Sequence, residues 1–289
     1  MSTTQKPLYG VFFILCAGLL LASHDGISKY LTYTYPLIMV IWLRYFVQTL
    51  VMVLLFFPKM RWDILRTRRP WLQLVRAISL LSISLLFISG LRYIPLAEAT
   101  AVMFLAPLIV TVLSAVILRE KVSKGQWVAV SVGFLGVIFI VRPGGELFTP
   151  AILLPFAGSF CFAIYQLITR RLASTDHAVT SNFLSGLFGT LALSLLLPGQ
   201  YTLAVAGVDL LFMLLLGLLA MTAHMLLTMA LKYSTAATLA PFTYGQIIFA
   251  GAIGYFAFGQ MPDALSMFGV LIISCSGLAV AYLQHHAQA

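Results

Sequence analysis

Ionisable side chains stand inside long apolar stretches of this chain, which is an unusual place for them. Among them are Asp25, Lys29, Arg44, Arg76, Glu98 and His224. A charge in such surroundings costs about 2.5–3.5 kcal/mol on membrane-insertion scales, so each group needs a partner or a function. Carboxylate, ammonium and guanidinium groups can bind a charged ligand, and an imidazole can exchange a proton near neutral pH. These residue types therefore indicate ligand binding or proton movement.

Asp25 and Lys29 are four residues apart and share one face of a helix, where their charges could neutralise each other. Arg44 lies about 12 Å into the next apolar stretch at 1.5 Å per residue, and it could pair with Asp25. However, one carboxylate facing two cations leaves net positive charge. The alternative is that Arg44 or Lys29 holds a substrate carboxylate. We interpret Asp25, Lys29 and His224 as a possible ion-pair or coupling network.

Glu98 follows Pro95 at the start of another apolar stretch. A carboxylate there complements a helix dipole, and proline is tolerated at a helix start. Glu98 could instead face a substrate ammonium or titrate during function. His224 stands near the middle of a later stretch, either as a hydrogen-bonded packing residue or as a proton relay.

Uncharged polar and aromatic residues in the apolar stretches could line a cavity or only pack between helices. Polar examples are Tyr165, Gln166, Asn182, Ser185, Thr243, Tyr244 and Gln246. Deep aromatic side chains could enclose an apolar part of a substrate; they are Trp42, Tyr45, Phe104, Tyr165 and Tyr244. The substrate-binding residues predicted from all these groups are Arg44, Trp42, Glu98, Phe104, Tyr165, Gln166, His224, Tyr244 and Gln246.

The composition requires these residues to be positioned by membrane-spanning helices. Of the 289 residues, 9% are charged and 61% are hydrophobic, against about 25% charged in an ordinary soluble domain. Unbroken apolar runs of about 20 residues favour helices, whereas the strands of a membrane barrel would alternate polar and apolar residues. The net charge of +9 comes from basic residues in short loops, so nucleic acid is not an expected partner. The three cysteines lack metal-ligand spacing.

Ten spans are predicted, near residues 8–31, 36–57, 71–90, 96–118, 126–142, 150–169, 179–197, 208–230, 236–258 and 264–284. With a cytoplasmic N-terminus, the inner loops receive Lys6, Lys59, Arg61, Arg66, Arg68, Arg69, Arg119, Lys121, Lys124, Arg170, Arg171 and Lys232. The outer side receives Lys29, Arg92 and Arg142. The positive-inside rule therefore places both termini in the cytoplasm.

A weak internal repeat divides the chain into two halves, residues 1–145 and 146–289. Leu91-Arg92-Tyr93 recurs 140 residues later as Leu231-Lys232-Tyr233. Each half holds five spans, and an odd number turns the second copy upside down in the membrane. The loop after span 4 is basic whereas its counterpart carries Gln260 and Asp263, as expected for opposite sides. The expected fold is an all-α membrane protein of ten transmembrane helices, forming two inverted five-helix repeats around a central cavity.

Several segments together resemble EamA-type members of the drug/metabolite transporter superfamily. In the first half they are Asp25 to Leu31, Trp42-Leu43-Arg44-Tyr45, Pro95 to Ala101 with Phe104-Leu105-Ala106-Pro107, Arg119-Glu120-Lys121 and Gly133 to Gly144. In the second half they are Ala240 to Tyr244 and Phe258 to Asp263. The likeness covers essentially the whole chain. It departs where Gln260 replaces the equivalent of Glu120 and where Gly245-Gln246-Ile247 replaces the region of Ala106-Pro107.

The resemblance implies a carrier of the bacterial inner membrane that moves small metabolites by alternating access. Similar members include exporters of aromatic and other neutral amino acids, and importers of riboflavin or S-adenosylmethionine. Amino-acid export is the first expectation and import of such a vitamin or nucleoside-type metabolite the alternative. The substrate carboxylate would meet Arg44 or Lys29, and its ammonium would meet Glu98, Gln246 or Tyr244. Expected partners are the substrate and membrane lipid, and no oligomeric state is predicted.

Enzymatic and ATP-driven functions are not expected. The chain has no Gly-x-x-x-x-Gly-Lys-Ser/Thr loop, no His-Glu-x-x-His pair and no Gly-x-Ser-x-Gly elbow. No metal or cofactor is expected, so transport would draw on gradients of ions or substrate. The two halves would rock about a midplane site, with Pro107 and Pro241 among the positions where spans 4 and 9 bend.

Overall fold

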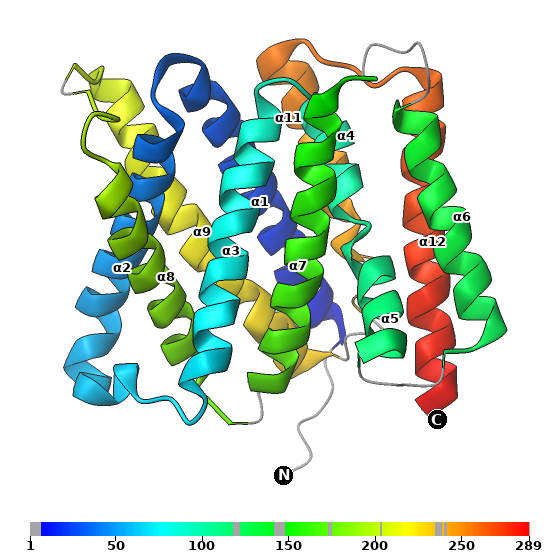
Figure 1. Ribbon diagram of the computed structural model, residues 1–289, viewed down its shortest axis with the longest axis horizontal. Helices are drawn as coiled ribbons and strands as arrows, with labels where there is room; N and C mark the ends of the chain where they lie inside the picture. The colour runs from blue at the N-terminus through cyan, green and yellow to red at the C-terminus, as the bar shows by residue number, and fades with distance from the viewer. Residues whose placement is uncertain are drawn as a thin grey trace.

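The computed structural model describes residues 7–117, 122–141, 148–172, 175–202, 204–234, 239 and 242–288, and the regular structure in these ranges is entirely helical. Figure 1 shows the helices side by side, with the start of the first helix and the end of the last helix at the same end of the bundle. An even number of membrane crossings returns the chain to the side on which it began. The sequence-based expectations for Lys6, Arg119, Glu120, Lys121, Arg142 and Pro241 lie outside the described residues.

The helices follow the predicted spans closely. In the first half they are α1 (Pro7–Thr34), α2 (Leu37–Met60), α3 (Pro70–Leu91), α4 (Leu96–Met103), α5 (Ala106–Ile117) and α6 (Lys124–Val141), with the short 3-10 helix η1 (Arg61–Leu65) after α2. In the second half they are η2 (Pro150–Ile152), α7 (Leu153–Leu172), α8 (Ala178–Leu196), α9 (Gly207–Tyr233), α11 (Gly245–Phe258) and α12 (Ala264–Gln288). Within the described ranges, nine segments are long and apolar enough to span a membrane, and α11 is a shorter apolar helix.

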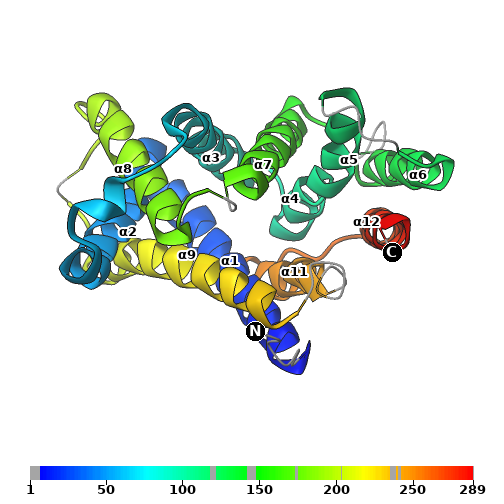
Figure 2. The same ribbon diagram turned by 90° about the horizontal axis from the view of Figure 1, so that it is seen from below.

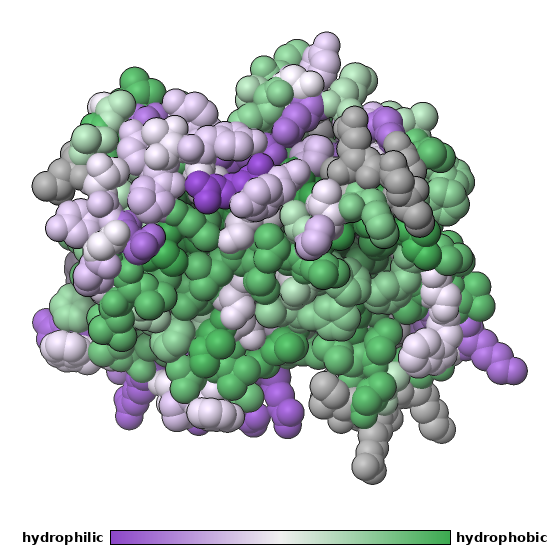
Figure 3. Space-filling model, turned by 45° about the horizontal axis from the view of Figure 1, so that its top comes forward, coloured by the Kyte–Doolittle hydropathy of each residue, from purple (hydrophilic) through white to green (hydrophobic). Residues whose placement is uncertain are grey.

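The surface is apolar where a soluble protein would be polar. Large side chains such as Leu54, Leu195, Ile248 and Phe256 are 65–84% exposed. Figure 3 shows a hydrophobic band across the face in view, with hydrophilic residues gathered above and below it. Lipid tails satisfy such a surface, whereas water would not. The chain is a multi-pass membrane protein.

The two halves interlock rather than stand side by side. Helix α1 packs on α9 and α11 of the second half, and its counterpart α7 packs on α3, α4 and α5 of the first. Helix α2 packs on α8, and α6 packs on α12. Exchanging the two halves leaves this pattern unchanged, as two inverted copies require. In Figure 2, α7 lies in the row of α3, α4, α5 and α6, while α1 lies in the row of α9, α11 and α12.

Spans 4 and 9 are the interrupted ones. Helix α4 ends at Met103 and α5 begins at Ala106, so Phe104 and Leu105 form a turn within one span. Pro107 lies in the first turn of α5, where its missing N–H is tolerated. In the second half, α11 begins at Gly245 directly after a turn at Tyr244. The interruption of span 4 lies just before Pro107, while the bending of this span during transport and the central cavity stay predictions.

Glycine permits the close approach of α6 and α12. A Cβ added to Gly269 would lie 2.6 Å from the backbone oxygen of Gly136, and one added to Gly136 would lie 2.9 Å from the oxygen of Gly269. Backbone atoms cannot move aside as a flexible side chain can. Small residues at this crossing are therefore required for the two helices to pack in lipid, where packing replaces the hydrophobic effect.

We predict that Gly269→Ala destabilises the protein by about 1–3 kcal/mol, because overpacking forces two backbones apart. Thermal unfolding of the purified protein in detergent measures this effect. Gly207→Ala is the matched control, since a Cβ at Gly207 has no atom within 4 Å. Equal midpoints for Gly269→Ala and the wild type would contradict the packing argument.

Candidate functional site

A buried His–Asp pair lies on α1. His24 Nδ1 and Asp25 Oδ1 are 2.9 Å apart, and both side chains are buried. Asp25 therefore pairs with its neighbour and not with Lys29 or Arg44, the two partners considered from the sequence. The second ring nitrogen of His24, Nε2, is buried without a hydrogen-bond partner.

Arg44 of α2 is held by neutral groups. Its Nη1 donates to Ser84 Oγ at 3.0 Å, and its guanidinium lies 4.6 Å from the ring centre of Tyr45. Arg44 Nε is buried and has no hydrogen-bond partner. Helix α9, which carries His224, packs against both α1 and α2. These residues of α1, α2 and α9 form one group, and we call His24, Asp25, Arg44 and His224 the central cluster.

Close backbone packing brings α9 to this cluster. A Cβ added to Gly217 would lie 2.8 Å from the backbone oxygen of Arg44 and 2.8 Å from the nitrogen of Gln48. His224 follows Gly217 by seven residues, which is two helical turns, so both residues face α2. Glycine at position 217 thus lets α9 approach α2 and places the imidazole near Arg44.

Lys29 caps a helix of the same half. Its ammonium donates to the carbonyl oxygens of Leu91 at 2.5 Å and Ile94 at 2.8 Å, and it lies 5.7 Å from the ring centre of Phe258. The last carbonyls of α3 have no partner within their own helix and carry the negative end of its dipole. A buried cation there satisfies these groups, which gives Lys29 a structural role.

Glu98 is a buried carboxylate in the first turn of α4. Its Oε2 has no hydrogen-bond partner, and the nearest charges that act on it belong to Asp263 and Lys29. These three groups lie toward the end of the bundle opposite the chain termini, where α1 ends and α4 begins (Figure 1). The charged residues that act on Glu98 are thus different from those of the central cluster, and Glu98 is not part of that cluster.

The two interrupted spans meet through a pair of aromatic rings. Phe104 lies in the turn between α4 and α5, and its ring centre is 5.1 Å from that of Tyr244 in the turn before α11. The two positions are 140 residues apart, which is the spacing of the repeat. The Tyr244 hydroxyl has no hydrogen-bond partner and occupies the place where a Cβ of Gly277 would lie. Gln246 packs against α1 at Gly18.

Arg76 of α3 is the buried cation that the sequence interpretation left without a role. All five of its N–H groups are used, by Thr169, Ser181, Ser185, Tyr165 and Asn182. The partners belong to α7 and α8, so Arg76 joins the first half of the chain to the second. Tyr165, which we predicted to bind substrate, hydrogen-bonds to this guanidinium at 2.7 Å and also lies under it.

Two further predicted residues, Trp42 and Gln166, are not part of the central cluster. Trp42 donates to Ser194 Oγ at 2.8 Å and stacks on Phe46, which is 39% exposed. Residues two positions apart on a helix point in nearly opposite directions, so Trp42 and Arg44 occupy different faces of α2. Gln166 is half-buried on α7 beside Tyr165.

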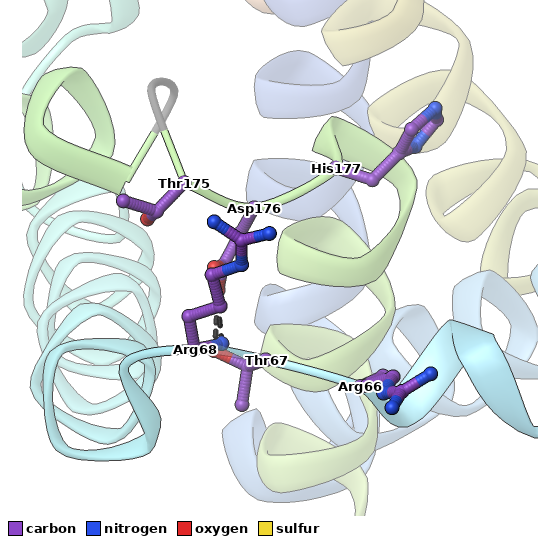
Figure 4. Close-up of a pocket in the computed structure, with 6 residues that line it drawn as sticks. All are labelled: Arg66, Thr67, Arg68, Thr175, Asp176 and His177. Atoms are coloured by element: carbon purple, nitrogen blue, oxygen red, sulfur yellow. Dashed lines mark hydrogen bonds between the residues drawn. The ribbon is translucent and has the colours of Figure 1, made fainter.

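Polar contacts from Arg76 continue to the loops at the end that carries the termini. Gln73 donates to Ser181 Oγ and to Asp176 Oδ2, both at 2.8 Å. Asp176 also accepts hydrogen bonds from the Thr67 hydroxyl and from the Arg68 N–H. Figure 4 shows Asp176 facing Thr67 and Arg68, with the side chains of Arg66 and His177 directed away. Burial alone would raise the pKa of Asp176, but these hydrogen bonds outweigh it and lower the pKa.

Interlocked inverted repeats with ionisable groups buried between them define a multi-pass transporter of the inverted-repeat class. The EamA-like transporter family matches this sequence twice, over residues 8–142 and 149–282. The chain belongs to the EamA-like transporter family.

Named relatives are transporters as well. The S-adenosylmethionine uptake transporter of Rickettsia felis is 27% identical over 97% of this chain and 95% of its own length. The riboflavin transporter of Vibrio cholerae is 28% identical over 98% of this chain and 95% of its own length. A solved crystal structure with 17% identity has a TM-score of 0.66 and covers 96% of this chain and 99% of that one, a likeness of fold alone.

We predict that Arg76→Gln destabilises the protein by about 3–5 kcal/mol, because it leaves several buried oxygens without their donor. Thermal unfolding in detergent measures the change. Arg66→Gln is the control, since Arg66 is exposed and its ion pair with Asp63 is 3.6 Å long. Equal losses in the two variants would show that the Arg76 contacts do not hold α3 to α7 and α8.

Asp176 gives a prediction with a pH dependence. Its lowered pKa means that the charged form stabilises the folded state fully above about pH 4, the ordinary pKa, and that this stabilisation is lost as pH falls through the lowered value. Asp176→Asn should therefore cost about 1 kcal/mol at pH 7, because the site is partly exposed to solvent. The difference from wild type should shrink below pH 4. Unfolding midpoints measured against pH test this, with the exposed Asp63→Asn as control; a difference that is constant with pH would contradict it.

Proposed function

We propose that this protein is an uptake carrier for S-adenosylmethionine or a closely related nucleoside-type metabolite, working by alternating access in the bacterial inner membrane. One observation carries the proposal. Four S-adenosylmethionine uptake transporters of Rickettsia species match 95–97% of this chain at 25–27% identity. The relatives thus support the alternative of the two sequence-based expectations better than amino-acid export.

The chemistry of the buried groups suits such a substrate. S-adenosylmethionine carries a carboxylate, an ammonium, a sulfonium and a heteroaromatic base. The described spans offer a cation in Arg44, carboxylates in Asp25 and Glu98, and aromatic rings in Phe104 and Tyr244. Aromatic faces bind both flat bases and cations. Each chemical part of the substrate therefore has a possible counterpart among the predicted site residues.

Riboflavin is the second candidate. The Vibrio cholerae riboflavin transporter covers this chain as fully as the Rickettsia proteins do, at 28% identity. Riboflavin has a large heteroaromatic ring but neither a carboxylate nor an ammonium. It would use the aromatic residues and leave the charged groups of the central cluster without a ligand.

For the transport cycle, we propose two units, residues 1–145 and 146–289, with the termini in the cytoplasm. The basic residues of the loops support this orientation, because Lys59, Arg61, Arg66, Arg68 and Arg69 lie between α2 and α3 at the end with the termini. Separating the units as rigid halves would break the five hydrogen bonds of Arg76. We therefore propose that α3 moves together with α7 and α8, while the turns at Phe104 and Tyr244 absorb the bending.

Transport into liposomes tests the function. The purified protein is reconstituted, and entry of labelled S-adenosylmethionine, riboflavin and phenylalanine is followed separately. We expect saturable entry of S-adenosylmethionine above that of protein-free liposomes, because the central cluster offers charges for its polar end. Saturable movement of phenylalanine alone would overturn the proposal in favour of amino-acid transport, and movement of riboflavin alone would favour the second candidate.

A further inference from the structure

Two atoms of the central cluster have unused hydrogen-bonding capacity. His24 Nε2 and Arg44 Nε are both buried without partners, and each residue is 5% exposed. Buried polar atoms in folded proteins almost always have a partner, so each exception needs an explanation. The two residues lie on α1 and α2, and α9 packs against both of these helices. A ligand that lay between these helices could meet both atoms.

Asp25 decides which kind of partner His24 needs. If Asp25 is ionised, its carboxylate only accepts hydrogen bonds, and His24 Nδ1 then carries the proton of the 2.9 Å contact. In a neutral imidazole the other nitrogen, Nε2, then has a lone pair and accepts a hydrogen bond. A ligand that donates a proton to Nε2 would also be attracted by the negative charge of Asp25. An ammonium group has both properties.

Arg44 needs the opposite kind of partner. Its Nη1 is occupied by Ser84, and its face is covered by Tyr45. The edge formed by Nε and Nη2 remains for a ligand, and two parallel N–H groups match the two oxygens of a carboxylate. Within the described residues no carboxylate lies within 4.0 Å of Arg44. A bound carboxylate would supply the partner that the described residues do not give to this edge.

The other buried cations do not compete for the same ligand. Arg76 uses all five N–H groups on α7 and α8, and Lys29 donates to two backbone carbonyls at the end of α3. His224, the fourth member of the cluster, lies on the face of α9 that packs against α2. Among the described residues, Arg44 is thus the buried cation that has a nitrogen, Nε, buried without a partner.

We infer that the central cluster binds the head group of an α-amino acid, the ammonium and carboxylate that share one carbon. The carboxylate would lie against the Nε and Nη2 edge of Arg44, and the ammonium would donate to His24 Nε2. Asp25 is a positioning residue, because it fixes the proton on His24 Nδ1 and supplies the balancing charge. The inference deepens the proposed function and rests on it, since the methionine part of S-adenosylmethionine carries this head group and riboflavin does not.

Substrate analogues test the inference on the unaltered protein, so that folding of a variant is not at issue. Each is used to inhibit entry of labelled S-adenosylmethionine into liposomes. S-adenosylhomocysteine keeps the head group and loses the sulfonium; decarboxylated S-adenosylmethionine loses the carboxylate; methylthioadenosine loses the whole head group. We expect the last two to inhibit about 10- to 100-fold more weakly than S-adenosylhomocysteine, because each leaves a buried group unpaired. Equal inhibition by all three would overturn the inference and leave the uptake function intact.

Variants then assign the two contacts. Arg44→Gln should raise the KM for S-adenosylmethionine by about 10- to 100-fold and change the inhibition by decarboxylated S-adenosylmethionine little, because that analogue has no carboxylate to lose. His24→Leu should weaken the binding of both S-adenosylmethionine and its decarboxylated analogue. His24→Gln should recover part of this affinity, because its amide oxygen can accept a hydrogen bond from the ammonium. Asp25→Asn should act in the same direction as His24→Leu. Arg66→Gln is the control. If Arg44→Gln weakened the binding of S-adenosylmethionine and of decarboxylated S-adenosylmethionine equally, the role of Arg44 would be overturned.

The head-group site can still be tested if S-adenosylmethionine is not the substrate. Should the wild type carry neutral amino acids and not S-adenosylmethionine, inhibition by methionine is compared with that by its methyl ester and by 3-methylthiopropylamine. Stronger inhibition by methionine would support the head-group site although the proposed function had failed. Entry of riboflavin that is unchanged by Arg44→Gln and by methionine would overturn both proposals.

Discussion

Hydrogen bonding without water is the constraint on which the rest of this structure depends. A polar group within a lipid-embedded bundle must find its partner inside the protein. Arg76 meets this requirement with five neutral oxygens on two helices, and Lys29 meets it at the free carbonyls of α3. Both cations therefore fix how helices sit against each other. By contrast, His24, Arg44 and Glu98 are ionisable residues that each have a buried polar atom without a partner among the described residues.

Close helix approach is the second condition, and it explains why the halves interlock. Gly136 and Gly269 let α6 and α12 touch through their backbones, and Gly217 does the same for α9 against α2. Each of these crossings joins one half of the chain to the other. The repeats are therefore halves of one bundle and not two bodies joined by a linker. A change of shape that opens one end has to be made by groups of helices drawn from both repeats.

The spans could be predicted from the sequence because each is a local apolar run, and the inversion because each half holds an odd number of them. The partners of charged residues could not. Helical spacing predicted that Asp25 would pair with Lys29, yet Asp25 contacts its neighbour His24. Lys29 instead donates to the carbonyl oxygen of Leu91, the last residue of α3, which is 62 residues away in the sequence. Arg76 was visible as a charge within a span, but its five partners come from sequence positions about 90–110 residues away. Such pairings depend on the packing of whole helices, which local patterns do not contain.

The ring contact between Phe104 and Tyr244 has a consequence for the history of the chain. The two residues are equivalent positions of the two copies, and they touch each other. In a symmetric dimer of single copies, such a position would face itself, and every substitution would alter both sides at once. Once the copies are fused in one chain, each side can change alone. The hydroxyl of Tyr244, which fits over Gly277 and has no counterpart on Phe104, is a difference that two copies in one chain can carry and two identical chains cannot.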